Sequence, residues 1–118
     1  MGFTAIQTSL DSLFDPSAGE IPLNGSGMKI INTDFVSDGL PGDEFNGDDP
    51  YIKENIEFSY PVFVPASGGS KVIILLHGLN ERAWDKYLAW AYYLAGGTNS
   101  YVILFPIAFH ISRAPVSW

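Results

Sequence analysis

Two continuous apolar runs and one alternating run dominate the pattern of hydrophobic and polar positions along this chain. Residues 72–76 and 102–105 are apolar at every position, which predicts strands of a parallel sheet with helices over both of its faces. Residues 55–64 alternate, which predicts a half-buried strand. Pro61 places that strand at or near a sheet edge, because proline cannot donate to a ladder. The apolar side of the alternating strand would carry Ile56, Phe58, Tyr60, Val62 and Val64.

Residues 82–95, between the two apolar runs, repeat hydrophobic side chains at spacings of three and four and so predict an amphipathic helix. Asn80 would cap the start of this helix, and Gly96-Gly97 would end it in the left-handed conformation. Strand, helix and strand together predict a βαβ unit with its site at the carboxyl ends of the strands. Three aromatic residues near the less apolar side of the helix could form a ligand platform, but packing is the favoured interpretation: Trp90, Tyr92 and Tyr93.

The first part of the chain, residues 1–54, differs in composition from residues 55–118. It is a loop-rich, acidic lead-in with one predicted strand at 28–35 and a short amphipathic helix around 6–14. Eight of the 13 acidic residues lie between Asp34 and Glu57. A calcium loop at residues 38–50 is one hypothesis, but the EF-hand register would place a lysine at the twelfth position, so a solvated acidic turn is favoured.

The charge balance narrows the range of partners. With 6 basic and 13 acidic residues, the formal net charge is −7, which disfavours nucleic acid and anionic membrane surfaces as partners. The chain has no cysteine, so disulfides and thiolate chemistry are excluded. Residues 1–14 lack the basic and apolar regions of a secretory signal, and the cytoplasm is the expected compartment. No cofactor and no metal are expected.

The two predicted loops after the apolar runs carry a family resemblance. Leu76-His-Gly-Leu-Asn-Glu-Arg82 follows the first run, and Phe105-Pro-Ile-Ala-Phe-His110 with Arg113-Ala-Pro115 follows the second. In this order of elements they resemble the early part of the α/β-hydrolase fold, which has a His-Gly oxyanion loop after its third strand. They resemble more closely an uncharacterised bacterial family of hydrolase-like proteins. The similarity covers residues 55–118 and implies the N-terminal part of a mixed, mostly parallel sheet with flanking helices.

The resemblance also implies an acyl-transfer site around this loop. In the hydrolase pattern, the residue after His-Gly supplies a backbone N–H to the oxyanion, and that role passes to Leu79. Gly78 would let the chain turn close to the substrate. A tight turn without any substrate is the competing interpretation. Substrate contacts would come from polar residues that follow the two strands: His77, Asn80, His110 and Arg113.

The nucleophile of such a site is missing from the sequence. No Gly-x-Ser-x-Gly elbow occurs, and both histidines precede the place where the elbow would follow. We therefore expect the N-terminal part of a serine-hydrolase-like enzyme that acts on an ester, amide or related acyl bond of a small-molecule substrate. This part would supply the oxyanion loop but no triad, and it would be inactive alone. The alternative is a non-catalytic binding or structural protein that keeps a hydrolase-like sheet.

Overall fold

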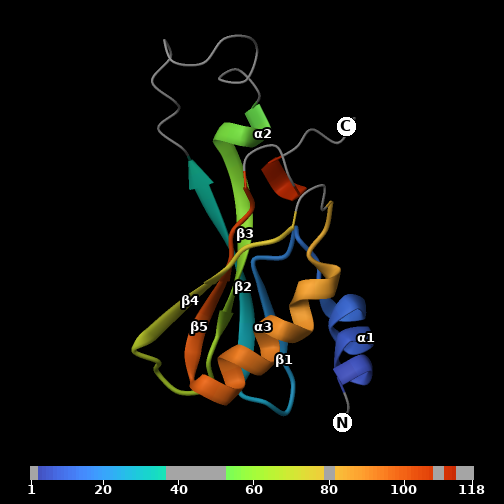
Figure 1. The fold of residues 1–118 in the computed structure, drawn as a ribbon, viewed down its shortest axis with the longest axis vertical. Helices are drawn as coiled ribbons and strands as arrows, with labels where there is room; N and C mark the ends of the chain where they lie inside the picture. The colour runs from blue at the N-terminus through green and yellow to red at the C-terminus, as the bar shows by residue number, and fades with distance from the viewer. Residues whose placement is uncertain (1–2, 37–52, 79–81, 108–110, 114–118) are drawn as a thin grey trace.

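The computed structural model describes residues 3–36, 53–78, 82–107 and 111–113, which form five strands and four helical segments (Figure 1). The elements in chain order are α1 (Phe3–Leu13), β1 (Glu20–Leu23), β2 (Met28–Val36), α2 (Lys53–Ile56), β3 (Glu57–Val64), β4 (Lys71–Leu75), α3 (Asp85–Thr98), β5 (Ser100–Leu104) and the 3₁₀ turn η2 (Ile111–Arg113). The strand predicted at 28–35 and the short helix near the N-terminus are confirmed by β2 and α1.

The strands form one mixed sheet in the order β1-β2-β3-β5-β4. Three neighbouring pairs are antiparallel, and only β4 and β5 are parallel. The predicted mostly parallel, α/β-hydrolase-type sheet is therefore wrong. The physical reason is that a parallel pair needs a long crossover, and the described part of the chain supplies one only through α3, between β4 and β5.

A tight hairpin that the sequence analysis did not predict adds β1 to the sheet. Residues 24–27, Asn-Gly-Ser-Gly, join β1 to β2. Gly25 and Gly27 have φ of 83° and 76°, a region that side chains disfavour, and Ser26 Oγ donates to the Leu23 carbonyl at 2.6 Å. An Asn-Gly pair before a strand is a hairpin signal, so the sequence held the information for this turn.

Strand β3 is confirmed as a strand, but it lies inside the sheet, not at an edge. The sheet accepts Pro61 because the β3–β5 ladder pairs Val62 with Ile103 and Phe63 with Val102, and ends before the proline. Phe63, on the side predicted to be less apolar, is fully buried. Burial on β3 therefore follows the position of the helices more closely than the count of apolar residues on each side.

Helix α3 confirms the predicted helix but is displaced toward the C-terminus. It begins at Asp85 after Trp84, which makes no side-chain capping hydrogen bond. The predicted stop at Gly96-Gly97 is wrong, since both glycines lie within the helix. Asn99 takes the left-handed position instead, with φ of 51°, and its N–H caps the Ala95 carbonyl. Asn80, the predicted cap, lies outside the described residues.

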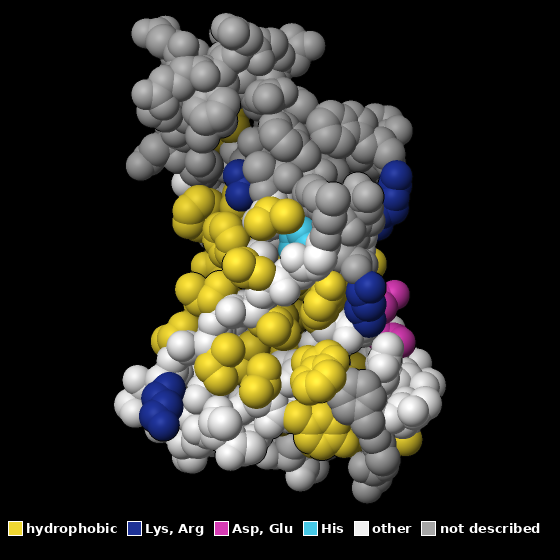
Figure 2. All heavy atoms as spheres, in the orientation of Figure 1, with side chains coloured by type: hydrophobic (Ala, Val, Ile, Leu, Met, Phe, Trp, Pro, Cys, Tyr) yellow, Lys and Arg dark blue, Asp and Glu magenta, His cyan; other side chains and the backbone are white. Residues whose placement is uncertain are grey.

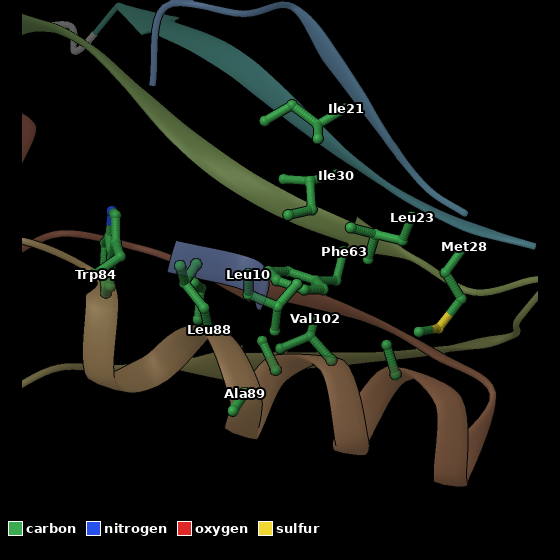
Figure 3. Close-up of a cluster of buried hydrophobic side chains, with 13 residues drawn as sticks. Leu10, Ile21, Leu23, Met28, Ile30, Phe63, Trp84, Leu88, Ala89 and Val102 are labelled. Carbon is green, nitrogen blue, oxygen red and sulfur yellow. The ribbon is translucent and has the colours of Figure 1, made fainter. Parts of the chain in front are cut away.

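The hydrophobic core lies between one face of the sheet and the helices α1 and α3, which lie side by side (Figure 1). Figure 3 shows Leu10 of α1 and Leu88 of α3 directed toward Phe63 and Val102 of the sheet. Strands β1 and β2 also contribute to this core, through Ile21, Leu23, Met28 and Ile30. Residues 3–36 therefore share a single core with the βαβ unit.

The opposite face of the sheet is much more open. Val72, Ile74 and Leu76 are 59%, 61% and 58% exposed. The prediction of helices over both faces of this apolar run is therefore wrong for the described residues. Figure 2 shows hydrophobic side chains at the surface along the margin where β4 runs in Figure 1. Four rings on β2, β3 and directly after β5 pack against one another, and among them Phe58 is buried: Phe35, Phe58, Tyr60 and Phe105.

Candidate functional site

The carboxyl ends of β4 and β5 bring together the two loops in which the sequence analysis placed a site. The strands are parallel and pair from Lys71–Ser100 to Leu75–Leu104, so the residues that follow them leave the sheet side by side. His77 and Gly78 follow β4, and Pro106 and Ile107 follow β5.

His77 ties the two loops together. The backbone N–H of Ile107 donates to His77 Nε2 at 2.9 Å, and His77 Nδ1 lies 2.7 Å from the carbonyl oxygen of Gly78. Because Nε2 accepts, the proton sits on Nδ1 and is donated to the Gly78 carbonyl, so the ring is the neutral Nδ1–H tautomer. The ring is 8% exposed and meets the Trp84 ring edge-on, with centroids 5.4 Å apart.

Gly78 is held from the other side by the first turn of α3. Its backbone N–H donates to Tyr87 Oη at 2.9 Å. Tyr87 in turn packs against Trp84 at 6.1 Å between centroids. In this arrangement the Gly78 N–H is already used inside the protein, so a ligand could reach it only if Tyr87 moved.

Arg113 lies where the second loop returns to the sheet. Its Nη1 donates to the Pro106 carbonyl at 3.3 Å, and its guanidinium carbon lies 4.4 Å from the centroid of the Phe58 ring. Partial burial lowers the pKa of the Arg113 guanidinium, which remains charged at neutral pH. Ile111, in the same turn, has φ of 51° and is packed against the core. A β-branched residue in that conformation is strained, which requires support from the surrounding packing.

One family model, the Family of unknown function (DUF6051), matches residues 24–118. The chain belongs to this family. The DUF6051 match contains β2 to η2 and therefore every residue of the candidate site described above. A search of curated proteins and a search of solved structures each gave no match.

The predicted site residues of this DUF6051 chain have different outcomes. Leu79, Asn80 and His110 lie outside the described residues, as does the acidic segment 38–50. His77, Gly78 and Arg113 are described, and the structure brings His77 and Arg113 to the same loop after β5, at Ile107 and Pro106. Within the described residues, His, Asp and Glu side chains form no group of three that could hold a metal ion. No helix in the described ranges combines the length and apolar character needed to cross a bilayer.

Two residues that hold the site were not singled out for it by the sequence analysis. Trp84 and Tyr87 belong to the segment 82–95 that was predicted as an amphipathic helix, and they contact His77 and Gly78 respectively. The available signal was their position near the start of a helix that directly follows the His-Gly loop. Such residues lie over the carboxyl ends of the strands in a βαβ unit.

Proposed function

We propose that this chain supplies the oxyanion loop of a serine-hydrolase-like site that acts on an ester, amide or related acyl bond. In this proposal the nucleophile comes from outside these 118 residues, because the sequence has no Gly-x-Ser-x-Gly elbow. The observation that carries the proposal is the pair of hydrogen bonds made by the His77 ring, one to the Gly78 carbonyl and one from the Ile107 N–H. They fix the main chain immediately before Leu79 against the neighbouring loop.

A fixed main chain is what oxyanion stabilisation requires. Negative charge develops on the carbonyl oxygen during acyl transfer, and a preorganised N–H stabilises it without having to reorganise. The Gly78 N–H is already bound to Tyr87, so the proposal assigns the donor role to Leu79. His77 is then a positioning residue that acts through the backbone, and not a substrate contact.

Substrate contact by Asn80, His110 and Arg113 stays part of the proposal. The charged guanidinium of Arg113 suits a carboxylate or a phosphate group. Its described contacts with Phe58 and the Pro106 carbonyl also shape the loop after β5. An anionic substrate would therefore meet a guanidinium whose orientation is already set by the protein.

A non-catalytic binding or structural role is the second candidate, and one observation favours it. The described polar groups of the site bind mainly to the protein's own backbone: His77 to Gly78 and Ile107, and Arg113 to Pro106. Such a pattern also suits a loop whose only role is to hold two strands and a helix together.

Two substitutions at Leu79 separate these candidates in the protein that carries this segment together with its nucleophile. Leu79→Pro removes the backbone N–H and is expected to lower kcat by roughly a hundredfold or more, whereas Leu79→Ala keeps the donor and most of the activity. Circular dichroism of both variants controls for folding. Equal losses in two folded variants would assign Leu79 to packing and would contradict the oxyanion role.

The isolated chain gives an independent test. It should not hydrolyse p-nitrophenyl acetate above background, because an oxyanion loop needs a positioned nucleophile to attack the carbonyl carbon. Saturable turnover that disappears in Ser112→Ala or Ser117→Ala would place the nucleophile within the chain and overturn this part of the proposal.

A further inference from the structure

A hollow lies at the other end of the βαβ unit, where α3 ends and β4 and β5 begin. It has a volume of about 750 Å³, within the range of small-molecule sites. Its wall includes Tyr92, Tyr93, Gly96 and Gly97 of α3, with Met28 of β2 and Asn99 facing them. In Figure 1 this end of α3 is the one remote from the loop after β4, so the hollow is separate from the candidate site around His77.

Two aromatic rings form a corner of this hollow. The Tyr92 and Tyr93 rings have centroids 5.5 Å apart and planes at 86° to each other. Tyr92 is half-buried against the core, which fixes one wall, while Tyr93 is 40% exposed. This edge-to-face packing uses one π face, and a remaining face on the side of the hollow would attract an organic cation.

The backbone contributes the same electrostatic sign. The hollow lies at the C-terminal end of α3, where the helix dipole is negative, and the last turn of this helix has no basic residue. Among the described residues that line the hollow, none has a charged side chain. The net charge of the whole chain, −7, adds a field that attracts cations.

Space for a ligand is provided by the two glycines. A methyl group at Gly97 would meet nothing within 4 Å, and one at Gly96 would only reach ordinary contact with Met28 Sδ, at 3.6 Å. Glycine lowers helix stability relative to alanine, so a pair of glycines in the last turn is costly for α3. Without side chains there, the space beside Tyr93 stays open.

From these features we propose that the hollow beside Tyr92 and Tyr93 binds a small organic cation through a quaternary or methylated ammonium group. The rings contact the methyl groups, and the helix end balances the positive charge. The tyrosine rings and the negative end of the helix dipole favour a cation over an anion, and the missing side chains at Gly96 and Gly97 leave room for it. This binding is independent of the proposed acyl-transfer role.

The test is titration of the full chain with choline, with binding measured by isothermal titration calorimetry or by ligand-observed NMR. Choline should bind saturably at millimolar concentrations, and its neutral isostere 3,3-dimethylbutan-1-ol should bind at least several-fold more weakly, because it lacks the charge. Tyr93→Ala should weaken choline binding roughly tenfold, and Tyr93→Phe should retain most of it. Trp90→Ala, which removes an exposed aromatic residue of the same helix that does not line the hollow, is the matched control and should have no effect.

A second variant protects the test against a folding defect. Gly97→Leu fills the hollow from a helical position and leaves both tyrosines in place, so it should abolish choline binding while keeping the helical circular dichroism signal. No saturable choline binding, equal binding of choline and its neutral isostere, or an equal loss from Tyr93→Ala and Trp90→Ala would each overturn the proposal.

Discussion

Both faces of the sheet carry apolar side chains, yet the protein covers them very differently. On one face, beneath α1 and α3, four side chains are fully buried: Ile30, Phe63, Val102 and Leu104. Their neighbours Leu10 and Met28 are at most 5% exposed. On the other face, Val72, Ile74 and Leu76 are each more than half exposed. A continuous apolar run therefore predicts a strand that is apolar on both sides. It does not predict that this part of the chain covers both sides.

Strand β4 makes the comparison within a few residues. Ile73 and Leu75 pack against the core cluster, and His77 continues that side under Trp84. The intervening residues Val72, Ile74 and Leu76 point to the open face. His77, with its contacts to Gly78 and Ile107, therefore lies at the end of the covered side of β4.

The largest expected effect separates the two faces by stability. Phe63→Ala should lower the free energy of unfolding by about 3–5 kcal/mol, because it leaves a cavity in the packed face. Ile74→Ala on the open face should cost less than about 1 kcal/mol, since the side chain is 61% exposed. Urea unfolding of both variants measures the difference. A similar loss in the two variants would mean that the open face is covered in solution.

The next prediction concerns the tie at the end of the covered face. His77→Ala should destabilise the protein by about 1–3 kcal/mol, because it leaves the Ile107 N–H without its acceptor. His77→Gln offers an amide oxygen near the position of Nε2 and should recover part of this loss. Thermal unfolding of the two variants measures it. If both variants lose the same stability, His77 stabilises the protein mainly by packing against Trp84, and its hydrogen bond to Ile107 contributes less.

The sequence predicted the elements of both faces better than it predicted their arrangement. Strands β2 to β5 and the helix between β4 and β5 follow from periodicity, since apolar spacing reports local structure directly. The parallel majority was wrong because strand direction depends on loops: the Asn24-Gly25 hairpin returns the chain at once, and only α3 allows a parallel return. Pro61 was misplaced because its effect depends on where a ladder ends.

The candidate site was predictable in place but less so in detail. The His-Gly loop at the end of β4 was visible as an abrupt end to an apolar run. The hydrogen bond between His77 and the Ile107 backbone was not visible in the sequence, because residues thirty positions apart meet only through the β4–β5 register. Tyr87 was missed as a partner of Gly78 for a similar reason, since a helical period shows which side a residue occupies but not which atom its hydroxyl meets.

A third prediction uses the open face directly. The isolated chain should self-associate, because an apolar surface at an edge strand with unpaired backbone groups is a contact site for a second copy. Ile74→Lys should weaken this association, so that roughly tenfold more protein is needed for it. This factor corresponds to the free energy of burying one aliphatic side chain. Leu13→Lys, at a 47% exposed position on α1, is the matched control. Size-exclusion chromatography with light scattering checks the result, and a sharp monomeric profile for the unaltered chain would contradict the prediction.

The smallest expected effect tests the helix that covers the packed face. Gly97 lies inside α3 and Gly25 lies in the β1–β2 turn, and a methyl group at either position would meet nothing within 4 Å. They differ in backbone conformation, since Gly25 has φ of 83°. Gly97→Ala should therefore raise the free energy of unfolding by about 0.5–1 kcal/mol, because alanine favours the helix and restricts the unfolded chain. Gly25→Ala should lower it by about 1 kcal/mol, because the new side chain strains the turn. Chemical unfolding of the two variants should therefore shift the free energy of unfolding in opposite directions. A loss of stability in Gly97→Ala would show that the last turn of α3 is not helical in solution. Helix α3 would then cover less of the packed face of the sheet.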